Sequence, residues 1–256
     1  MQGQHSDGSR SVNVEFDSGL AVLTIDRPHA RNAISLDTMD QLNAALDTVV
    51  EARVLVIKGA GDRAFVSGGD LKELAAITTH DEAAEMAWRM RGICDRLVNF
   101  SGPVIAALNG HALGGGAEFA TAADIRLAAD DIKIGFNQVT LQIMPAWGGA
   151  ERLAALVGPG RALMLAGTGE VLSAAEAERI GLVDKVFERS RFDDGWLQVA
   201  HALTAAPVRD IKRVVRGLSP TDAVDAFARH WISDEHWEAV DNRTKPVQSL
   251  DAGRPA

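Results

Sequence analysis

An apolar run is followed, five residues later, by three consecutive glycines and then by a helical pattern, and this junction constrains the fold more than any other stretch of the chain. Residues Pro103–Leu108 are apolar over a length that suits one buried strand. After Gly114–Gly116, the alanines and the phenylalanine within Ala117–Ala123 are typical of a buried helix. The sequence therefore predicts an α/β protein in which a strand, a glycine turn and the start of a helix meet.

The glycine turn has the composition of an anion-binding site. Glycines lack a β-carbon, so a ligand can lie directly against their peptide groups. The first turn of a helix has unpaired N–H groups and the positive end of the helix dipole, and both favour negative charge. Glu118 lies in this turn, which would place a proton-transferring carboxylate beside an anion-stabilising backbone. The alternative interpretation is that the glycines only let a strand and a helix pack closely.

A second glycine turn of the same kind lies earlier in the chain. The apolar residues Ala64–Val66 precede the small residues Ser67–Gly69, and a helix begins around Asp70 and Leu71. Two such turns could each direct one N–H group at the same oxygen atom, which is the arrangement of an oxyanion hole. Their spacing in the sequence alone does not establish that they converge.

Around these turns the sequence predicts a recurring unit of strand, strand and helix. Alternating residues predict a hairpin at Ser18-Gly19, and Ser35 or Asp37 is a suitable cap for the helix that follows. A long helical pattern covers about 80–100, and further strands are predicted at 53–58, 124–129, 132–136 and 182–187. We expect a flexible N-terminus over 1–11, a core domain over 12–190 and a helical C-terminal region over 191–256.

Composition excludes several classes of function. The chain has 256 residues, a net charge of −9 and a pI near 5.2, which argues against binding to nucleic acid or to an anionic membrane surface. It lacks the pattern of a secretory signal, and no apolar run is long enough to span a membrane. Cys94 is the only cysteine and the seven histidines show no metal-ligand spacing, so we predict no disulfide and no metal. These features together predict a cytoplasmic protein.

Several motifs, taken in order along nearly the whole chain, resemble those of the crotonase, or enoyl-CoA hydratase/isomerase, superfamily. They are Arg27-Pro28 with Asn32-Ala33, the strand 54–58, Phe65–Leu74, Asn109–Glu118, Ala123–Ala128, Pro145–Gly149, Ala174–Ala177 and Ile180–Val183. Such an ordered series is more specific than any single motif. The resemblance implies a crotonase-like superhelix of strand-strand-helix units, with a C-terminal helical region that assembles the protein as a homotrimer or a dimer of trimers.

The resemblance also implies a site for an acyl-coenzyme A thioester. The backbone N–H groups of Gly69 and Gly115 would form the oxyanion hole that stabilises a thioester enolate, and Glu118 would act as the acid or base. Coenzyme A is then part of the substrate, and no separate cofactor is expected. The family pattern places the coenzyme and the acyl group near Arg31, Ala33, Arg63, Ser67, Gly68, Asp70, Leu71, Lys72 and, at the wall of the acyl pocket, Trp147.

The chain departs from the hydratase pattern at one position. Enoyl-CoA hydratases use two glutamates, and Glu118 matches the first, but Gln138 occupies the position of the second. Glutamine cannot exchange a proton at neutral pH, although it can orient a water molecule or hold a carboxylate. If the alignment slips locally, another acid such as Asp124 or Glu151 would approach the substrate instead.

This departure leaves several functions open within an acyl-CoA lyase of the family. Hydration of a 2-enoyl-CoA needs Glu118, whereas isomerases of this family usually carry their base at the position of Gln138. Decarboxylation of a malonyl-type thioester needs no base, and Met144–Leu153 is similar to ethylmalonyl-CoA decarboxylase relatives, which also lack the second glutamate. The alternative outside the enzymes is a catalytically silent member that only binds acyl-CoA.

Overall fold

A computed structural model of the protein describes residues 10–244. Residues 1–9 of the expected flexible N-terminus lie outside the described residues, whereas Ser11 is buried and its N–H donates to Gln41 Oε1 at 2.8 Å. The chain divides into two compact units between Ala206 and Pro207. This division falls later than the boundary at 190 expected from the sequence, because the helix α8 (Phe192–Ala202) buries Trp196 and Ala200 in the core of the first unit.

The first unit contains a six-stranded sheet with the strand order β1-β2-β3-β5-β7-β10. Its strands are β1 (Val12–Asp17), β2 (Leu20–Ile25), β3 (Val54–Gly59), β5 (Val104–Leu108), β7 (Ile125–Ala129) and β10 (Lys185–Phe187). The predicted hairpin is confirmed, since β1 and β2 pair antiparallel across Ser18 and Gly19, which both have positive φ. The other strand pairs of this sheet are parallel.

A second sheet of four short strands has the order β4-β6-β8-β9. Its strands are β4 (Ala64–Val66), β6 (His111–Leu113), β8 (Lys133–Gly135) and β9 (Val171–Ser173). The chain passes from β3 to β4, from β5 to β6 and from β7 to β8, so three strands of the first sheet are each followed by a short strand of the second. A helix follows each pair, which gives the strand-strand-helix unit that the sequence predicted.

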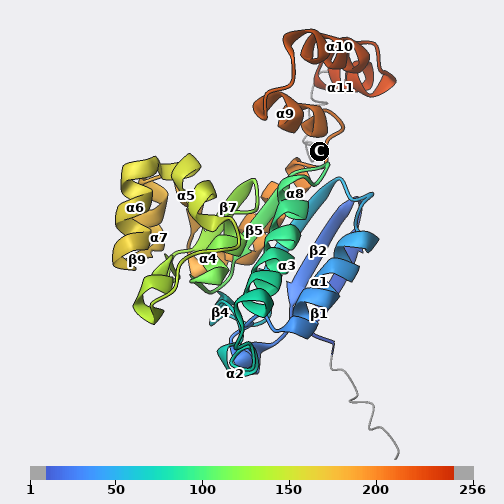
Figure 1. Ribbon diagram of the computed structural model, residues 1–256. Helices are drawn as coiled ribbons and strands as arrows, with labels where there is room; N and C mark the ends of the chain where they lie inside the picture. The colour runs from blue at the N-terminus through green and yellow to red at the C-terminus, as the bar shows by residue number, and fades with distance from the viewer. Residues whose placement is uncertain (1–9, 245–256) are drawn as a thin grey trace, which may run out of the picture. The chain divides into compact units, whose positions relative to one another are not determined.

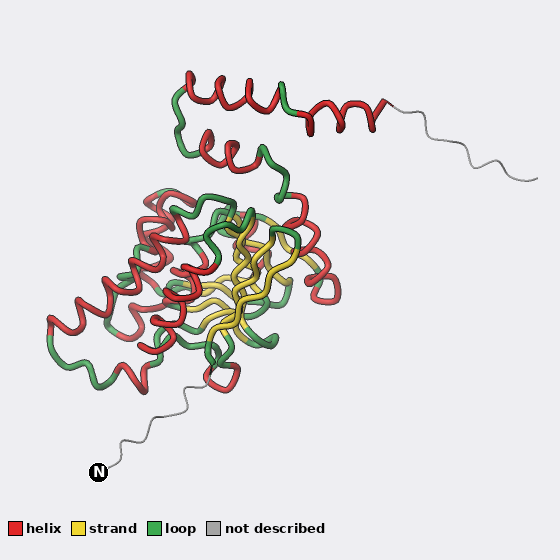
Figure 2. The backbone as a smooth tube through the Cα atoms, turned by 90° about the vertical axis from the view of Figure 1, so that its right-hand side faces the viewer, coloured by secondary structure: helices red, strands yellow, loops and turns green. Residues whose placement is uncertain are grey.

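Helices cover the sheets of this unit (Figure 1). They are α1 (Leu36–Thr48), α2 (Leu71–Leu74), α3 (His80–Val98), α4 (Gly115–Ala120), α5 (Gly149–Val157), α6 (Pro159–Thr168), α7 (Ala174–Arg179), α8, and the 3-10 helices η1 (Pro28–Ala30), η2 (Asn137–Leu141) and η3 (Arg189–Arg191). Ser35 caps α1 by accepting a hydrogen bond from the Thr38 N–H, and α3 begins with a capping box between Thr79 and Glu82. Figure 2 shows the same strands in yellow, turned by 90°, with helices packed against them.

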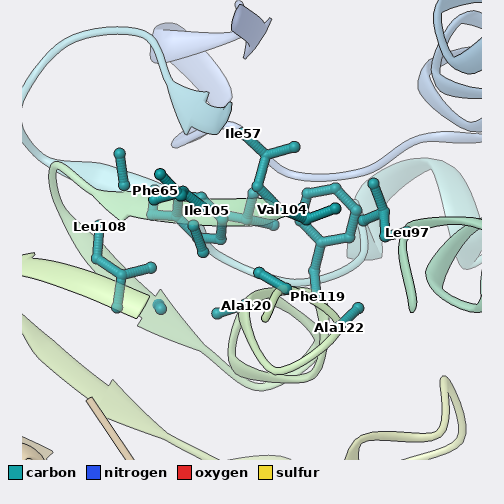
Figure 3. Close-up of a cluster of buried hydrophobic side chains, with 14 of the residues drawn as sticks. Ile57, Phe65, Leu97, Val104, Ile105, Leu108, Phe119, Ala120 and Ala122 are labelled. Carbon is teal, nitrogen blue, oxygen red and sulfur yellow. The ribbon is translucent and has the colours of Figure 1, made fainter. Parts of the chain in front are cut away.

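The start of α4 is anchored in the hydrophobic core between the two sheets. Phe119 of α4 packs on Phe65 of β4 with ring centroids 6.0 Å apart, and Ile57 and Ile105 of the large sheet lie in the same cluster (Figure 3). These side chains are almost fully buried. The core therefore fixes the position of α4 relative to the end of β4. The first glycine turn follows β4, and α4 begins in the second.

The second unit consists of α9 (Val208–Val215), α10 (Pro220–Trp231) and α11 (Asp234–Thr244). Its helical character agrees with the expectation for the C-terminal region. Within it, the ring of Trp231 contacts the rings of Phe227, His236 and Trp237. Among residues 10–244 of the whole chain, no helix is both long enough and apolar enough to cross a membrane.

Candidate active site

The topology brings three separate turns of the chain to one edge of the small sheet. The strands β4, β6 and β8 are neighbours and run parallel, so their carboxyl ends lie at the same edge. Gly69 follows β4, Gly115 follows β6 and Gln138 follows β8. Glu118 lies one helical turn after Gly115 on α4. The residues predicted to carry the chemistry are thus gathered in space, although they come from three parts of the sequence.

The two glycine turns are in direct contact. A β-carbon on Gly116 would lie 1.8 Å from the carbonyl oxygen of Val66, and one on Gly68 would lie 3.4 Å from the Gly115 nitrogen. Within the described residues, neither the Gly69 N–H nor the Gly115 N–H donates a hydrogen bond to a protein acceptor. Two unpaired N–H donors therefore border one cavity, where they can bind a carbonyl oxygen or an anion.

The indole ring of Trp147 packs against both turns. A β-carbon on Gly115 would lie 2.3 Å from this ring, and one on Gly69 would lie 4.0 Å from it. Any larger residue at 115 would therefore displace the ring. This contact explains why the turn has glycine at this position, and the buried ring of Trp147 forms part of the wall of the cavity.

Glu118 is the carboxylate of this site, and only 2% of its surface is exposed. Its Oε2 accepts hydrogen bonds from the backbone N–H groups of Trp147 at 2.8 Å and Gly149 at 3.0 Å, and its Oε1 accepts one from Gln138 Nε2 at 2.8 Å. Burial raises the pKa of Glu118, while these N–H donors favour the charged form and offset part of the rise. The carboxyl group is thus held in one orientation with a pKa shifted toward neutral pH.

Gln138 contacts Glu118 directly. Its Nε2 donates to the carboxylate, whereas its Oε1 is buried and has no hydrogen-bond partner within residues 10–244. Of the residues described, Glu118 is the only carboxylate that lines this cavity. The alternative acids do not approach it, because Asp124 accepts a hydrogen bond from the Val104 N–H at 2.8 Å and Glu151 pairs with Arg91 at 2.9 Å.

Two contributions to the site were missed from the sequence. The first is the pair of backbone N–H groups, from Trp147 and Gly149, that hold Glu118. Gly148-Gly149 before a helix repeats the pattern of the other two glycine turns, and that signal could have found them. The second is Arg152, whose Nη2 donates to the Trp147 carbonyl and whose Nη1 lies 3.6 Å from Asp95 Oδ1. Arg152 therefore braces the loop that carries these N–H groups.

The cavity beside Glu118 has a volume of about 340 Å³ and a largely apolar wall. At its rim Leu141, Ile143 and Met144 are exposed to solvent. Nine of the predicted site residues line it, namely Arg31, Ser67, Gly68, Gly69, Leu71, Gly115, Glu118, Gln138 and Trp147. The cavity can thus hold an apolar group next to a carboxylate and two free N–H donors.

The remaining predicted residues line two further cavities. One of about 840 Å³ is bordered by Ala33, Asp70 and Lys72, and one of about 420 Å³ is bordered by Arg63. Arg31 and Ser67 line all three cavities. The predicted coenzyme-binding residues are therefore divided between two cavities, because Arg63 does not border the cavity that Ala33 and Lys72 line.

Asp70 has a structural partner of its own. Its carboxylate caps α2 and pairs with Arg27 at 2.9 Å. Partial burial is the largest single effect and acts to raise its pKa, but the hydrogen bonds from Arg27 and from the backbone of Glu73 and Lys72, together with the charge of Arg27, outweigh it, so the pKa lies below its usual value. Asp70 is thus a charged residue that fixes the wall of its cavity. In the described part of the chain, no group of three His, Cys, Asp or Glu side chains is arranged to hold a metal ion.

Comparison with known proteins finds similarity to enoyl-CoA hydratases in a family model, in curated sequences and in solved structures. The family model described as enoyl-CoA hydratase/isomerase matches residues 15–224. The chain is 39% identical over 202 residues to the short-chain-enoyl-CoA hydratase of Clostridium acetobutylicum, covering 77% of each chain. It is 41% identical over 181 residues to the crotonyl-CoA hydratase of Syntrophomonas wolfei subsp. wolfei, covering 70% of this chain and 69% of that protein. The crystal structure of the enoyl-CoA hydratase from Bacillus anthracis superimposes with a TM-score of 0.81 at 28% identity, covering 93% of this chain and 98% of that one.

Proposed function

The chain belongs to the enoyl-CoA hydratase/isomerase, or crotonase, family, and from this premise we propose that it is a lyase that adds water to the double bond of a 2-enoyl-CoA thioester. The observation that carries the proposal is the position of Glu118, a buried carboxylate that shares one cavity with two unpaired N–H groups. The names of the two hydratase relatives support the same reaction.

In the proposed reaction, the thioester carbonyl oxygen binds to the N–H groups of Gly69 and Gly115. Attack of water on the β-carbon moves electrons onto this oxygen, and the two donors and the dipole of α4 stabilise the resulting enolate. Glu118 takes a proton from the water and returns it to the α-carbon. A pKa raised by burial suits this double role, because the group must both accept and release a proton near neutral pH.

We propose that the coenzyme portion occupies the cavity bordered by Ala33, Asp70 and Lys72. This cavity shares Arg31, Ser67, Gly69 and Leu71 with the cavity of Glu118, so a single ligand can extend from one into the other. Arg31 and Lys72 are cationic and suit the phosphates of the coenzyme. No further cofactor is needed, because coenzyme A is part of the substrate.

The test is to incubate the protein separately with crotonyl-CoA, methylmalonyl-CoA and ethylmalonyl-CoA and to follow the products by mass spectrometry. We expect crotonyl-CoA to gain one water and the two malonyl-type thioesters to remain intact. Loss of CO₂ from a malonyl-type thioester, without hydration of crotonyl-CoA, would contradict hydration as the function.

Decarboxylation of a malonyl-type thioester is the second candidate, and Gln138 is the observation that favours it. A decarboxylase needs the oxyanion donors and one acid, and Glu118 is the only described carboxylate in the cavity. A silent member of the family that only binds acyl-CoA is the third. It predicts binding of all three thioesters, measured by calorimetry, with no product from any of them.

We propose further that the protein assembles as a homotrimer or a dimer of trimers through its C-terminal helices. In support, α9, α10, α11 and the C-cap residue of α10 carry exposed apolar side chains, and these are Ile211, Val214, Val215, Val224, Phe227, Trp231, Ile232 and Trp237. Exposed apolar side chains at this density are typical of protein interfaces. Light scattering coupled to size-exclusion chromatography measures the mass of the assembly, and a monomer at micromolar concentration would contradict this proposal.

A further inference from the structure

Asn137 lines the cavity of Glu118 and carries a side-chain amide without a hydrogen-bond partner. It is the first residue of η2, shortly after β8, and it is half-buried. Within residues 10–244 its side chain makes no hydrogen bond, and, unlike Gln138 Oε1, neither of its amide atoms is fully buried. A polar group that is unpaired but accessible at a cavity wall is available to a ligand.

This amide lies next to the glycine turn that precedes α4. A β-carbon on Gly114 would lie 3.4 Å from Asn137 Oδ1, and Gly114 lines the same cavity. The next residue, Gly115, carries one of the two unpaired N–H donors of the site. The amide of Asn137 is therefore close to the position where the thioester carbonyl would bind.

Asn137 lies on the side of the cavity away from the proposed coenzyme. The small sheet has the order β4-β6-β8, so Gly69 and Asn137 flank Gly115 from opposite sides. The coenzyme cavity is lined only by residues within 27–33 and 67–73, around η1 and from the end of β4 into α2. A thioester that enters from there and binds to the two N–H donors therefore extends its acyl group toward the side of Asn137.

The charges that line the cavity favour an uncharged partner for Asn137. Glu118 is the only carboxylate among the described lining residues, and Arg31, the only cation among them, also lines the coenzyme cavity. A carboxylate on the acyl group would thus share the cavity with Glu118 while its possible cationic partner lies toward the coenzyme. An amide both donates and accepts hydrogen bonds, which suits a hydroxyl or an oxo group.

We propose that Asn137 determines substrate specificity by binding an uncharged oxygen, a hydroxyl or an oxo group, on the acyl group close to the reacting double bond. The inference rests on the proposed function and narrows its substrate to 2-enoyl-CoA thioesters that carry such an oxygen. A wholly apolar acyl group would cover the amide without giving it a partner, and a site that leaves a polar group unpaired discriminates against such a ligand. Crotonyl-CoA would still be hydrated, but with a lower kcat/KM than a 4-hydroxy or 4-oxo analogue.

Two saturated thioesters of similar shape test this recognition without any turnover. In 4-oxopentanoyl-CoA an oxo oxygen replaces one methyl group of 4-methylpentanoyl-CoA, and neither has a double bond to hydrate. The Kd of each is measured by calorimetry for the wild type, for Asn137→Leu and for the control Asn99→Leu, the same substitution at an exposed residue that does not line the cavity.

The quantity compared is the Kd of the 4-methyl thioester divided by the Kd of the 4-oxo thioester. We expect Asn137→Leu to lower this ratio by about 3- to 10-fold, the effect of one uncharged hydrogen bond. The affinity for 4-methylpentanoyl-CoA should stay the same or rise, because the leucine offers an apolar contact in place of an unpaired amide. Asn99→Leu should keep the wild-type ratio.

Asn137→Ala is a second variant, which removes the amide without adding bulk if the leucine variant does not fold, and the same fall in the ratio is expected. An unchanged ratio in either folded variant, or an equal loss of affinity for both thioesters, would overturn the inference, since the amide would then be unused or purely structural. If the ratio falls as expected but the wild type adds no water to crotonyl-CoA or to its 4-hydroxy analogue, the proposed hydration is wrong while recognition of the acyl oxygen stands.

Discussion

The side chain of Glu118 occupies the space beside Gly149, so that a β-carbon on residue 149 would lie 2.3 Å from Glu118 Cγ and 2.8 Å from its Oε2. The same glycine donates its N–H to that oxygen. We therefore predict that Gly149→Ala pushes the carboxylate out of position and lowers kcat by about 100-fold, within the range for loss of a general acid or base. The control is Gly167→Ala, where a β-carbon meets nothing within 4 Å. Wild-type kcat in Gly149→Ala would show that the position of Glu118 is not critical.

Replacing Glu118 by glutamine should abolish turnover and leave ligand binding nearly intact. The amide oxygen can accept the N–H groups of Trp147 and Gly149, and the amide nitrogen can donate to Gln138 Oε1 once that side chain rotates. The shape of the cavity is thereby kept, but no proton can be transferred, and we expect kcat to fall by about 10³-fold or more. Turnover of crotonyl-CoA and the Kd of butyryl-CoA by calorimetry measure the two effects. Unchanged turnover would remove Glu118 from the mechanism.

The same variant should alter how stability depends on pH. Burial raises the pKa of Glu118 above 4.5, so folded protein keeps this proton at pH values where the unfolded chain has lost it. The contribution of the group to stability is therefore full below its unfolded pKa of about 4.3 and is lost as the pH rises through the raised folded pKa. Glu118→Gln has no such loss, and we predict that it is more stable than the wild type at pH 7. Urea unfolding at several pH values measures this difference, which should shrink toward pH 4.

Arg152 should affect catalysis without touching the substrate. Its guanidinium group donates to the Trp147 carbonyl and lies near Asp95, and so holds the loop that binds Glu118. A lysine keeps the charge but cannot reproduce this planar geometry. We predict that Arg152→Lys lowers kcat about 10-fold with little change in KM, since one braced hydrogen bond is lost. Arg161→Lys, on the exposed side of α6, is the matched control. An equal effect of both substitutions would contradict this role.

Arg126 should be important for stability. Its side chain is 2% exposed and donates to the carbonyls of Leu182 and Ala123 and to the carboxylate of Asp184. Arg126→Met would leave the buried carbonyls of Leu182 and Ala123 without this donor, and at about 1–3 kcal/mol for each unsatisfied buried group we expect the free energy of unfolding to fall by about 2–4 kcal/mol. Arg229→Met removes an exposed ion pair with Asp225 and should cost less than about 1 kcal/mol. Chemical denaturation of both variants tests the contrast, and similar losses would contradict it.

The local parts of the fold could be predicted from the sequence because their causes are local. Ser18-Gly19 requires a tight turn, Ser35 caps a helix, and the glycines before Glu118 start α4, and the structure has each of these. The family was also recognised from ordered motifs and is confirmed by the comparisons. The predicted strand 182–187 is longer than the observed one, because Leu182 and Val183 are buried before the strand begins and only Lys185–Phe187 pairs with β7.

The detail of the site could not be predicted, because it depends on contacts between distant segments. The parallel order of β4, β6 and β8 brings Gly69, Gly115 and Gln138 together, and no local pattern encodes that order. The backbone N–H groups of Trp147 and Gly149 also bind Glu118 from a distant segment, and the Gly148-Gly149 pair before α5 indicates a glycine turn there but not that it meets Glu118. The division of the chain after Ala206 likewise depends on how α8 packs, since its residues follow a helical pattern that would suit either unit.

The stacking of Phe65 on Phe119 has a consequence for how such a protein can diversify. These two rings tie the segments that carry the Gly69 and Gly115 N–H groups to one interior, whereas the cavity beside Glu118 ends at the solvent-exposed side chains of Leu141, Ile143 and Met144. Substitutions at that rim can change which acyl groups fit while the chemical apparatus stays assembled. If the proposed hydration is the function, the residues that select the acyl group are thus separate from those that carry out the reaction.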